Sequence, residues 1–300
     1  SSNLGEAIAV LTEVQMITPR GKINLHFLKN TFKITGPSYD YKIPYNHINR
    51  AFILPKQDGA SIAFVVGLTT PMRQGNTSYP FIVFQMKKGT ECEITLNIPD
   101  DEGERSKVLK HPIDKEIKAD LYDVMAKLFK SIIGVGVIIP GKFKSSQNVA
   151  SLKCNNKTSE GYLYPMEKSI IFINKPTIFI LLDEILSVNC ERLSESNLKL
   201  FDMVIKTKRN ESFEFSKIER REYEPLSKYF IDKKVNFTSD EGEEGDDKLV
   251  TGKKIRQAPD MEIDLPSEDE EDEDFDSQEG DEESESASEE SNKKERSKNR

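Results

Sequence analysis

Short runs of alternating apolar and polar residues, separated by turn-forming residues, fill most of the first 238 positions. A period of two predicts β-strands with one buried face. In the first half we expect strands at 22–28, 31–35, 39–43, 47–54, 61–67, 81–86 and 92–98. In the second half the same pattern predicts strands at 149–154, 161–164, 169–173, 177–182, 185–190, 200–206 and 212–215.

One amphipathic segment follows each series of strands. After Pro112, apolar residues recur at intervals of three and four, which predicts a helix with these residues on one face: Ile117, Leu121, Val124, Met125, Leu128 and Ile132. The second block ends in a helix containing Leu226, Tyr229 and Phe230. Pro225 is expected at its first position, because a proline deeper in a helix loses a hydrogen bond. The polar stretches 71–79 and 99–112 are expected to be loops.

Seven strands and then one helix, occurring twice, predict a mainly β (α+β) chain of two tandem pleckstrin-homology-like domains. Each would be a seven-stranded antiparallel sandwich or barrel with a C-terminal helix. We expect the first domain at 1–139 and the second at 140–238. The connection at 134–141 is apolar and contains three glycines and a proline. It therefore predicts a short, packed linker and a rigid pair of domains.

Charge divides the chain into unlike parts. Residues 239–290 hold 24 acidic and 4 basic residues, a formal charge of -20, whereas residues 1–238 carry +7 and residues 291–300 carry +4. Few apolar residues interrupt the acidic segment, so it cannot bury enough surface to offset its ordering entropy. We expect a disordered acidic tail at 239–290 and a basic end at 291–300. The first residue is not Met, so the chain is expected to be part of a longer protein.

Several kinds of chemistry find no support in the sequence. The three cysteines have no metal-site spacing, and His26, His47 and His111 have no partner at ligand spacing, so structural roles are expected for all of them. Residues 136–142 spell GxxxxGK, but Phe143 follows where a phosphate-binding loop needs Ser or Thr. No nucleophile motif and no membrane-length apolar run occur. We expect a non-catalytic chain with no cofactor, metal, small-molecule substrate or membrane partner.

Several strings, in order, resemble one known family. They are TPRGK at 18–22, YDYKIPY at 39–45, RQGNTSY at 73–79, IPGKF at 139–143, GYLYPME at 161–167, NKP at 174–176 and FSKIER at 215–220. Together they are similar to the structure-specific recognition protein family, the small subunit of the histone chaperone FACT. The resemblance covers about 14–237, and the acidic tail follows where that family has one.

This resemblance implies a nuclear, chromatin-bound protein whose partners are histones, nucleosomal DNA and the large FACT subunit, in transcription, replication and repair. The family's N-terminal domain, which contacts the large subunit, does not precede Ser1, so that contact is expected through a domain outside this sequence. No high-mobility-group box follows the tail, as in fungal-type members. Pro225 also differs from the residue that the family usually has at that position of the helix.

Candidate binding residues fall into three groups. The tail is expected to compete with DNA phosphates for basic histone surfaces. Its histone-binding residues would be Glu268, Asp269, Glu270, Glu271, Asp272, Glu273, Asp274, Phe275 and Asp276, with Phe275 as an aromatic anchor, and Ser267 and Ser286 are candidate phosphorylation sites. Arg73, Gln74 and Asn76 form a second group, expected to contact histone or DNA. Lys142 and Lys144 form a third, suited to phosphate.

Two alternatives remain open at this point. A phosphoinositide- or phosphopeptide-binding adaptor with an acidic tail would also have pleckstrin-homology-like domains. The expected first hairpins offer mainly Lys29, Lys33 and Lys168, too few cations for a multiply charged lipid headgroup. A direct duplex-DNA binder is less favoured, because the charge of +7 is modest and no helix-in-groove motif is present.

Overall fold

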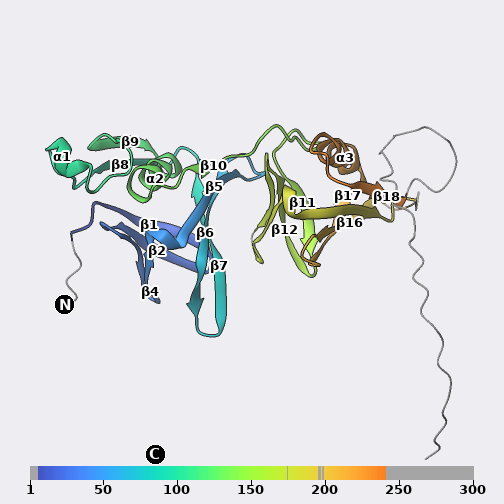
Figure 1. Ribbon diagram of the computed structural model, residues 1–300, viewed down its shortest axis with the longest axis horizontal. Helices are drawn as coiled ribbons and strands as arrows, with labels where there is room; N and C mark the ends of the chain where they lie inside the picture. The colour runs from blue at the N-terminus through green and yellow to red at the C-terminus, as the bar shows by residue number, and fades with distance from the viewer. Residues whose placement is uncertain (1–5, 174, 195–196, 198, 241–300) are drawn as a thin grey trace, which may run out of the picture. The chain divides into compact units, whose positions relative to one another are not determined.

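The computed structural model describes residues 6–173, 175–194, 197 and 199–240, which belong to one compact unit. The first domain is an eight-stranded sheet in the order β10-β5-β6-β7-β1-β2-β3-β4 (Figure 1). Its strands are β1 (Ala9–Thr18), β2 (Arg20–Phe27), β3 (Thr31–Gly36), β4 (Tyr39–Pro44), β5 (Ile48–Pro55), β6 (Ser61–Gln74), β7 (Thr77–Lys87) and β10 (Val137–Ile138).

Helical segments and a hairpin complete this first domain. The 3-10 turn η1 (Tyr45–His47) joins β4 to β5, and a separate two-stranded hairpin consists of β8 (Glu91–Thr95) and β9 (Glu116–Asp120). The short helix α1 (Glu102–Arg105) lies between them in the chain. Helix α2 (Leu121–Leu128) continues into the π-helical turn η2 (Phe129–Ile133), which ends at Gly134 in the left-handed conformation with φ 86°. Phe129 is the centre of this core, within 6 Å of the rings of Phe27, Phe32 and Phe64.

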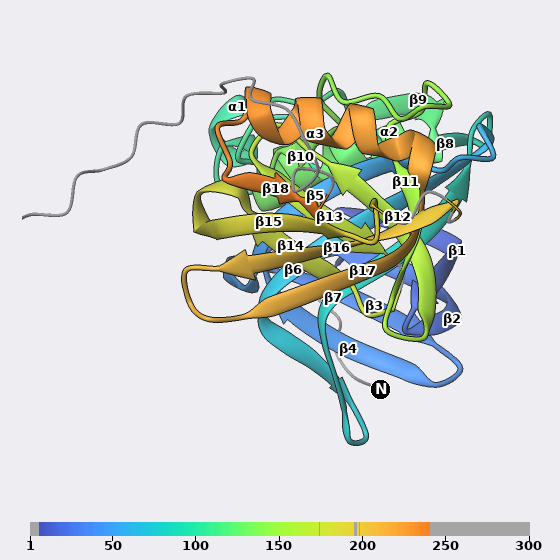
Figure 2. The same cartoon turned by 90° about the vertical axis from the view of Figure 1, so that its right-hand side faces the viewer.

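The second domain repeats this plan in an eight-stranded sheet ordered β14-β13-β12-β11-β17-β16-β15-β18. Its strands are β11 (Leu152–Asn156), β12 (Ser159–Pro165), β13 (Ser169–Ile173), β14 (Ile178–Leu181), β15 (Ile185–Glu191), β16 (Leu200–Thr207), β17 (Ser212–Glu219) and β18 (Phe237–Ser239). The 3-10 turns are η3 (Leu182–Glu184) and η4 (Arg220–Glu222), and helix α3 (Tyr223–Asp232) lies over the sheet (Figure 2). Leu226, Tyr229 and Phe230 face its core.

Both domains end in the same way. After the C-terminal helix the chain returns to the sheet and pairs in parallel with the fifth strand, β10 with β5 and β18 with β15. The other strand pairs of both sheets are antiparallel. The predicted class, tandem pleckstrin-homology-like domains with C-terminal helices, is therefore confirmed, with an added parallel strand in each domain.

Five expectations for individual elements were wrong. Strand β1 was missed, and the expected strand 92–98 belongs to the separate β8–β9 hairpin instead of the main sheet. Ile117 lies in β9, so the first helix begins at Leu121. The expected loop at 71–79 is the end of a long hairpin whose two strands pair from Met72 with Tyr79 to Gln74 with Thr77. Pro225 is the third residue of α3, still within the first turn, where backbone N–H groups have no intrahelical acceptor.

An apolar interface joins the two domains. It contains Phe52, Leu54, Ala63, Val65 and Val83 from the first domain and Tyr164, Met166, Ile171 and Ile173 from the second, all nearly or fully buried. Polar contacts flank it: the Tyr164 hydroxyl donates to the Pro55 carbonyl at 3.0 Å, and the Arg50 guanidinium lies 4.0 Å from the centre of the Phe179 ring. Residues 61–68 of strand β6 are consequently buried on both faces of the sheet, and Ala51, Phe52 and Leu54 of β5 are buried as well.

Candidate nucleic-acid and histone interface

The segment that enters the second domain presents two lysines outward. Phe143 is only 7% exposed and meets the Tyr229 ring edge to face, with 5.7 Å between ring centres. Because the flanking side chains point away from the one that is buried, Lys142 and Lys144 are exposed on either side of it. The linker therefore anchors itself through an aromatic residue and leaves both predicted lysines in solvent.

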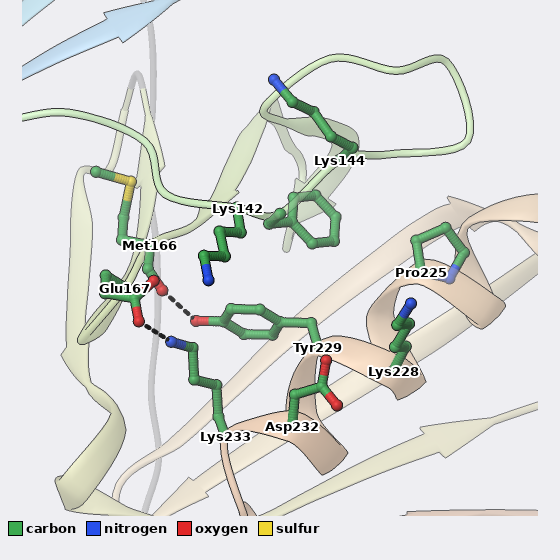
Figure 3. Close-up of a pocket in the computed structure, with 10 residues that line it drawn as sticks. Lys142, Lys144, Met166, Glu167, Pro225, Lys228, Tyr229, Asp232 and Lys233 are labelled. Carbon is green, nitrogen blue, oxygen red and sulfur yellow. Dashed lines mark hydrogen bonds and ion pairs between the residues drawn. The ribbon is translucent and has the colours of Figure 1, made fainter.

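Helix α3 provides the facing wall. Its buried residues orient Lys228 and Asp232 to the outside, and the Tyr229 hydroxyl donates to the Met166 carbonyl at 2.7 Å (Figure 3). Burial raises the pKa of the Tyr229 phenol, so this hydroxyl stays protonated and serves as a donor at neutral pH. Between the linker and α3 lies a cleft of about 510 Å³, which we call the lysine cleft: Lys142, Phe143, Lys144, Met166, Glu167, Pro225, Lys228, Tyr229, Asp232 and Lys233.

Charge in the lysine cleft is predominantly positive. Lys233 donates to Glu167 at 2.5 Å and, with further help from the charge of Lys142, holds the pKa of that carboxyl below its usual value. Among the described residues no ion pair engages Lys142, Lys144 or Lys228. Those three ammonium groups are therefore available to an anionic ligand. Phosphate groups suit them because each lysine is a compact point charge.

A buried carboxylate holds the lysine-bearing loop in place. Glu222 is only 4% exposed, and it accepts hydrogen bonds from the Ser146 backbone amide at 2.9 Å and from the Ser146 hydroxyl. Ser145 closes the same loop by accepting from the Val149 amide. Sequence reasoning missed Glu222. No local pattern indicated it, because its carboxylate makes no capping hydrogen bond to α3 and instead contacts Ser146, far away in the sequence.

The second predicted group lies at the tip of the β6–β7 hairpin. This hairpin extends beyond the other strands of its sheet (Figures 1 and 2). Buried Met72 fixes its base, Gly75 turns the chain with φ 56°, and Arg73 and Asn76 are exposed while Gln74 is half-buried. The tip and the lysine cleft belong to different domains, and no hydrogen bond or ion pair of the described residues joins Arg73, Gln74 or Asn76 to Lys142 or Lys144.

The first predicted group, the acidic tail, lies outside the described residues. It comprises the tail positions from Glu268 to Asp276, including Phe275, and the candidate phosphorylation sites Ser267 and Ser286. Their histone-binding and regulatory roles stay predictions from the sequence.

Several features bear on the alternatives. Lys33 is only 4% exposed and pairs with Asp40 at 2.9 Å, so it does not face a ligand at the first hairpin. An extended peptide can add a strand to an open sheet edge; in each domain the returning strand, β10 or β18, covers the fifth strand, which leaves β4 or β14 as the edge strand at the other end. Among the described residues there is no helix long and apolar enough to cross a membrane and no metal-binding group of His, Cys, Asp and Glu.

The three histidines belong to the first domain, where they take part in its secondary structure and hydrogen bonds. The Nε2 atom of His26 is 2.9 Å from the Thr35 hydroxyl, and burial together with the charge of Lys33 lowers the pKa of its imidazole. His47 ends the turn η1, and the His111 amide donates to the Ser131 carbonyl. Burial raises the pKa of the Cys154 and Cys190 thiols, with Cys190 at about 12, so neither is a ready nucleophile at neutral pH.

Two domains of this shared topology, joined through apolar faces, define a tandem pleckstrin-homology-like protein. Family models match accordingly: residues 6–137 match the SSRP1 PH domain, and residues 150–239 match the middle domain of the histone chaperone Rttp106-like family. The chain belongs to the structure-specific recognition protein family of FACT complex subunits.

Curated relatives are similar over both domains. FACT complex subunit POB3 of Kluyveromyces lactis is 33% identical over 250 residues, which is 82% of this chain and 44% of the relative. POB3 of Debaryomyces hansenii is 36% identical over 79% of this chain and 44% of the relative, and FACT complex subunit SSRP1 of Homo sapiens is 33% identical over 78% and 32%. The chain thus spans less than half the length of these relatives.

A solved structure described as the Spt16D Pob3N heterodimer aligns with 70% of this chain and 95% of its own chain. Its sequence identity is 10% and the TM-score is 0.29, a likeness too weak to inform on this protein.

Proposed function

We propose that this chain is the histone-binding portion of a FACT-type histone chaperone subunit, which binds histones and nucleosomes to reorganise chromatin in transcription, replication and repair. The observation that carries the proposal is the match of both domains, in order, to FACT complex subunits. The protein works in the nucleus and without catalysis, through exchange of contacts. A large FACT subunit is its partner.

The acidic tail supplies competition with DNA. Residues 239–290 carry a formal charge of -20, and both this segment and duplex DNA are polyanions whose binding to basic histone surfaces weakens with salt. Because the tail is tethered to the folded domains, its effective concentration near a docked histone is high. A histone that leaves DNA is therefore held by the tail and is later returned to DNA. Phosphorylation of Ser267 or Ser286 adds charge of the same sign.

The folded domains supply positioning. Exposed Lys142 and Lys144 contact phosphates of nucleosomal DNA, which fixes orientation without reading sequence. The exposed β6–β7 tip, with Arg73, Gln74 and Asn76, contacts histone or DNA at the nucleosome surface. The folded part thus carries a net positive charge of +7 and the tail a net negative charge of -20, an arrangement that suits a ligand containing both DNA and histones.

A competition experiment tests the proposal. Histones are mixed with excess short duplex DNA, and the full chain is added while free DNA is followed by gel electrophoresis. We expect free DNA to increase with added chain, and a variant with the seven acidic residues at 268–274 changed to their amides to release less. No release of DNA by the intact chain would contradict the proposed function.

A further inference from the structure

A second groove in the second domain has a composition that neither histones nor DNA explain. It lies where the sheet fails to close, between edge strand β14 with turn η3 on one side and the segment after α3 on the other. Its volume is about 640 Å³, and we call it the leucine groove: Leu181, Leu182 and Leu186, Lys168, Lys208 and Lys234, with Val235. It adjoins the lysine cleft, since Glu167 and Lys233 line both.

Backbone hydrogen bonds fix the lysines at its rim. The Leu182 amide donates to the Lys168 carbonyl at 3.0 Å, and the Lys208 amide donates to the Glu184 carbonyl at 2.8 Å, so both lysines are tied to turn η3. Lys234 follows α3 in the left-handed conformation with φ 56°, a position that glycine adopts with less strain. Its amide donates to the Ile231 carbonyl and the next amide, of Val235, to Phe230.

The apolar part of the groove is unusually exposed. Leu186 is 54% exposed although it lies in strand β15, whose neighbouring positions Ile185 and Val188 are buried. Leu181 and Leu182 are half-buried beside it. Among the described residues no ion pair engages Lys168, Lys208 or Lys234. The groove therefore combines free cations with leucine surface.

From this combination we infer that the leucine groove binds an acidic peptide segment of a partner protein, one that carries an apolar side chain among its carboxylates. The lysines attract the acidic residues, and the apolar side chain packs on Leu186, a contribution that salt does not screen. DNA phosphates gain nothing from leucine. The lysines repel a basic histone surface, so this groove is a separate site from the proposed histone contact.

The groove also carries carboxylates that argue against a membrane as its ligand. Asp183 and Glu167 line it together with the lysines. A uniformly anionic lipid surface cannot match this pattern of mixed charge, whereas a peptide can place its own groups between them. The unpaired outer edge of β14 offers such a peptide backbone hydrogen bonds as well.

Fluorescence anisotropy with the full chain tests the inference. The probe is a labelled twelve-residue peptide of Glu and Asp with one central Phe, compared with the same peptide carrying Ala instead of Phe. We expect the Phe peptide to bind more tightly, with an advantage of about fivefold or more that persists at raised salt. Leu186→Ser is expected to abolish that advantage, and Lys168→Glu to weaken both peptides about fivefold or more.

Matched controls are Leu200→Ser, at an exposed leucine of the same domain, and Lys29→Glu, at an exposed lysine of the first domain. Both should change affinity less than twofold. The inference is overturned if the peptides do not bind, or if the control variants lose as much affinity as the groove variants. It is also overturned if short duplex DNA or anionic vesicles use Leu186 themselves, that is, if they displace the Phe peptide less well from the Leu186→Ser variant than from the intact chain.

Discussion

At the scale of single residues, the buried Glu222 stabilises the loop that carries two lysines of the lysine cleft. Its carboxylate satisfies both donors of Ser146, and that loop carries Lys142 and Lys144 toward solvent. The two lysines were foreseeable because they surround an aromatic residue in a glycine- and proline-containing linker. Glu222 was not, because only the folded chain brings position 146 next to position 222.

Changing Glu222→Gln should destabilise the protein by about 1–3 kcal/mol, because the change weakens the charge-assisted hydrogen bonds that the buried Glu222 carboxylate accepts from Ser146. The free energy of unfolding is measured in urea. Glu224→Gln, at an exposed position two residues later, is the control and should stay within about 0.5 kcal/mol of the parent. Equal effects of the two changes would show that the Glu222 contact contributes nothing to stability.

Phe275→Ala should weaken histone-dimer binding by about tenfold or more, because burial of a phenyl ring contributes roughly 1.5–3 kcal/mol before ordering costs. Glu273→Ala removes only an exposed ion pair, worth about 0–1 kcal/mol. Titrations at low and raised salt separate the two contributions. If both variants lose the same small amount at each salt concentration, the tail is a plain polyelectrolyte.

At the scale of elements, the strands of the second domain were predicted well apart from β18, and most of the errors lie in the first domain. Strand β1 was missed because a register shift between Leu11 and Val14, with Glu13 at φ 61°, interrupts the alternation on which the prediction depends. Ile117 has the spacing of a helix, yet it belongs to a strand because β8, more than twenty residues earlier, pairs with it. Local sequence patterns do not predict pairing between strands that are this far apart in the chain.

Lys142→Ala and Lys144→Ala should each weaken binding of duplex DNA and lower the slope of log affinity against log salt by about one, if each lysine neutralises one phosphate. Binding is followed at four or more salt concentrations. Lys29→Ala provides the comparison, since Lys29 is also exposed but lies in the first domain. An unchanged slope in both cleft variants would remove them from the DNA contact.

At the scale of the whole described unit, the tandem domains share an apolar interface. The sequence carried a sign of it: residues 61–66 are nearly continuous in apolar character, and such runs are typical of strands covered on both faces. Strand β13 is likewise buried at every position. Which surface covers the second face was not predictable, because it depends on how the linker sets the two domains against each other.

The predicted rigid pairing has a direct test. Limited proteolysis should cut after residue 238 before it cuts at 134–141, and urea should unfold both domains in one transition. Phe52→Ala, which opens the shared interface, should shift that transition by about 3–5 kcal/mol. Early cleavage within 134–141, or two separate transitions in the intact chain, would mean that the domains act independently.

The central claim, that this chain binds histones, is tested most directly by titrating the full chain with purified histone dimers and, separately, with histone tetramers. Anionic vesicles containing phosphoinositides are titrated in parallel. The account predicts salt-sensitive binding to at least one histone assembly and no binding to the vesicles. Binding to the vesicles, lost on Lys29 or Lys168 substitution, with no binding to either histone assembly, would contradict it.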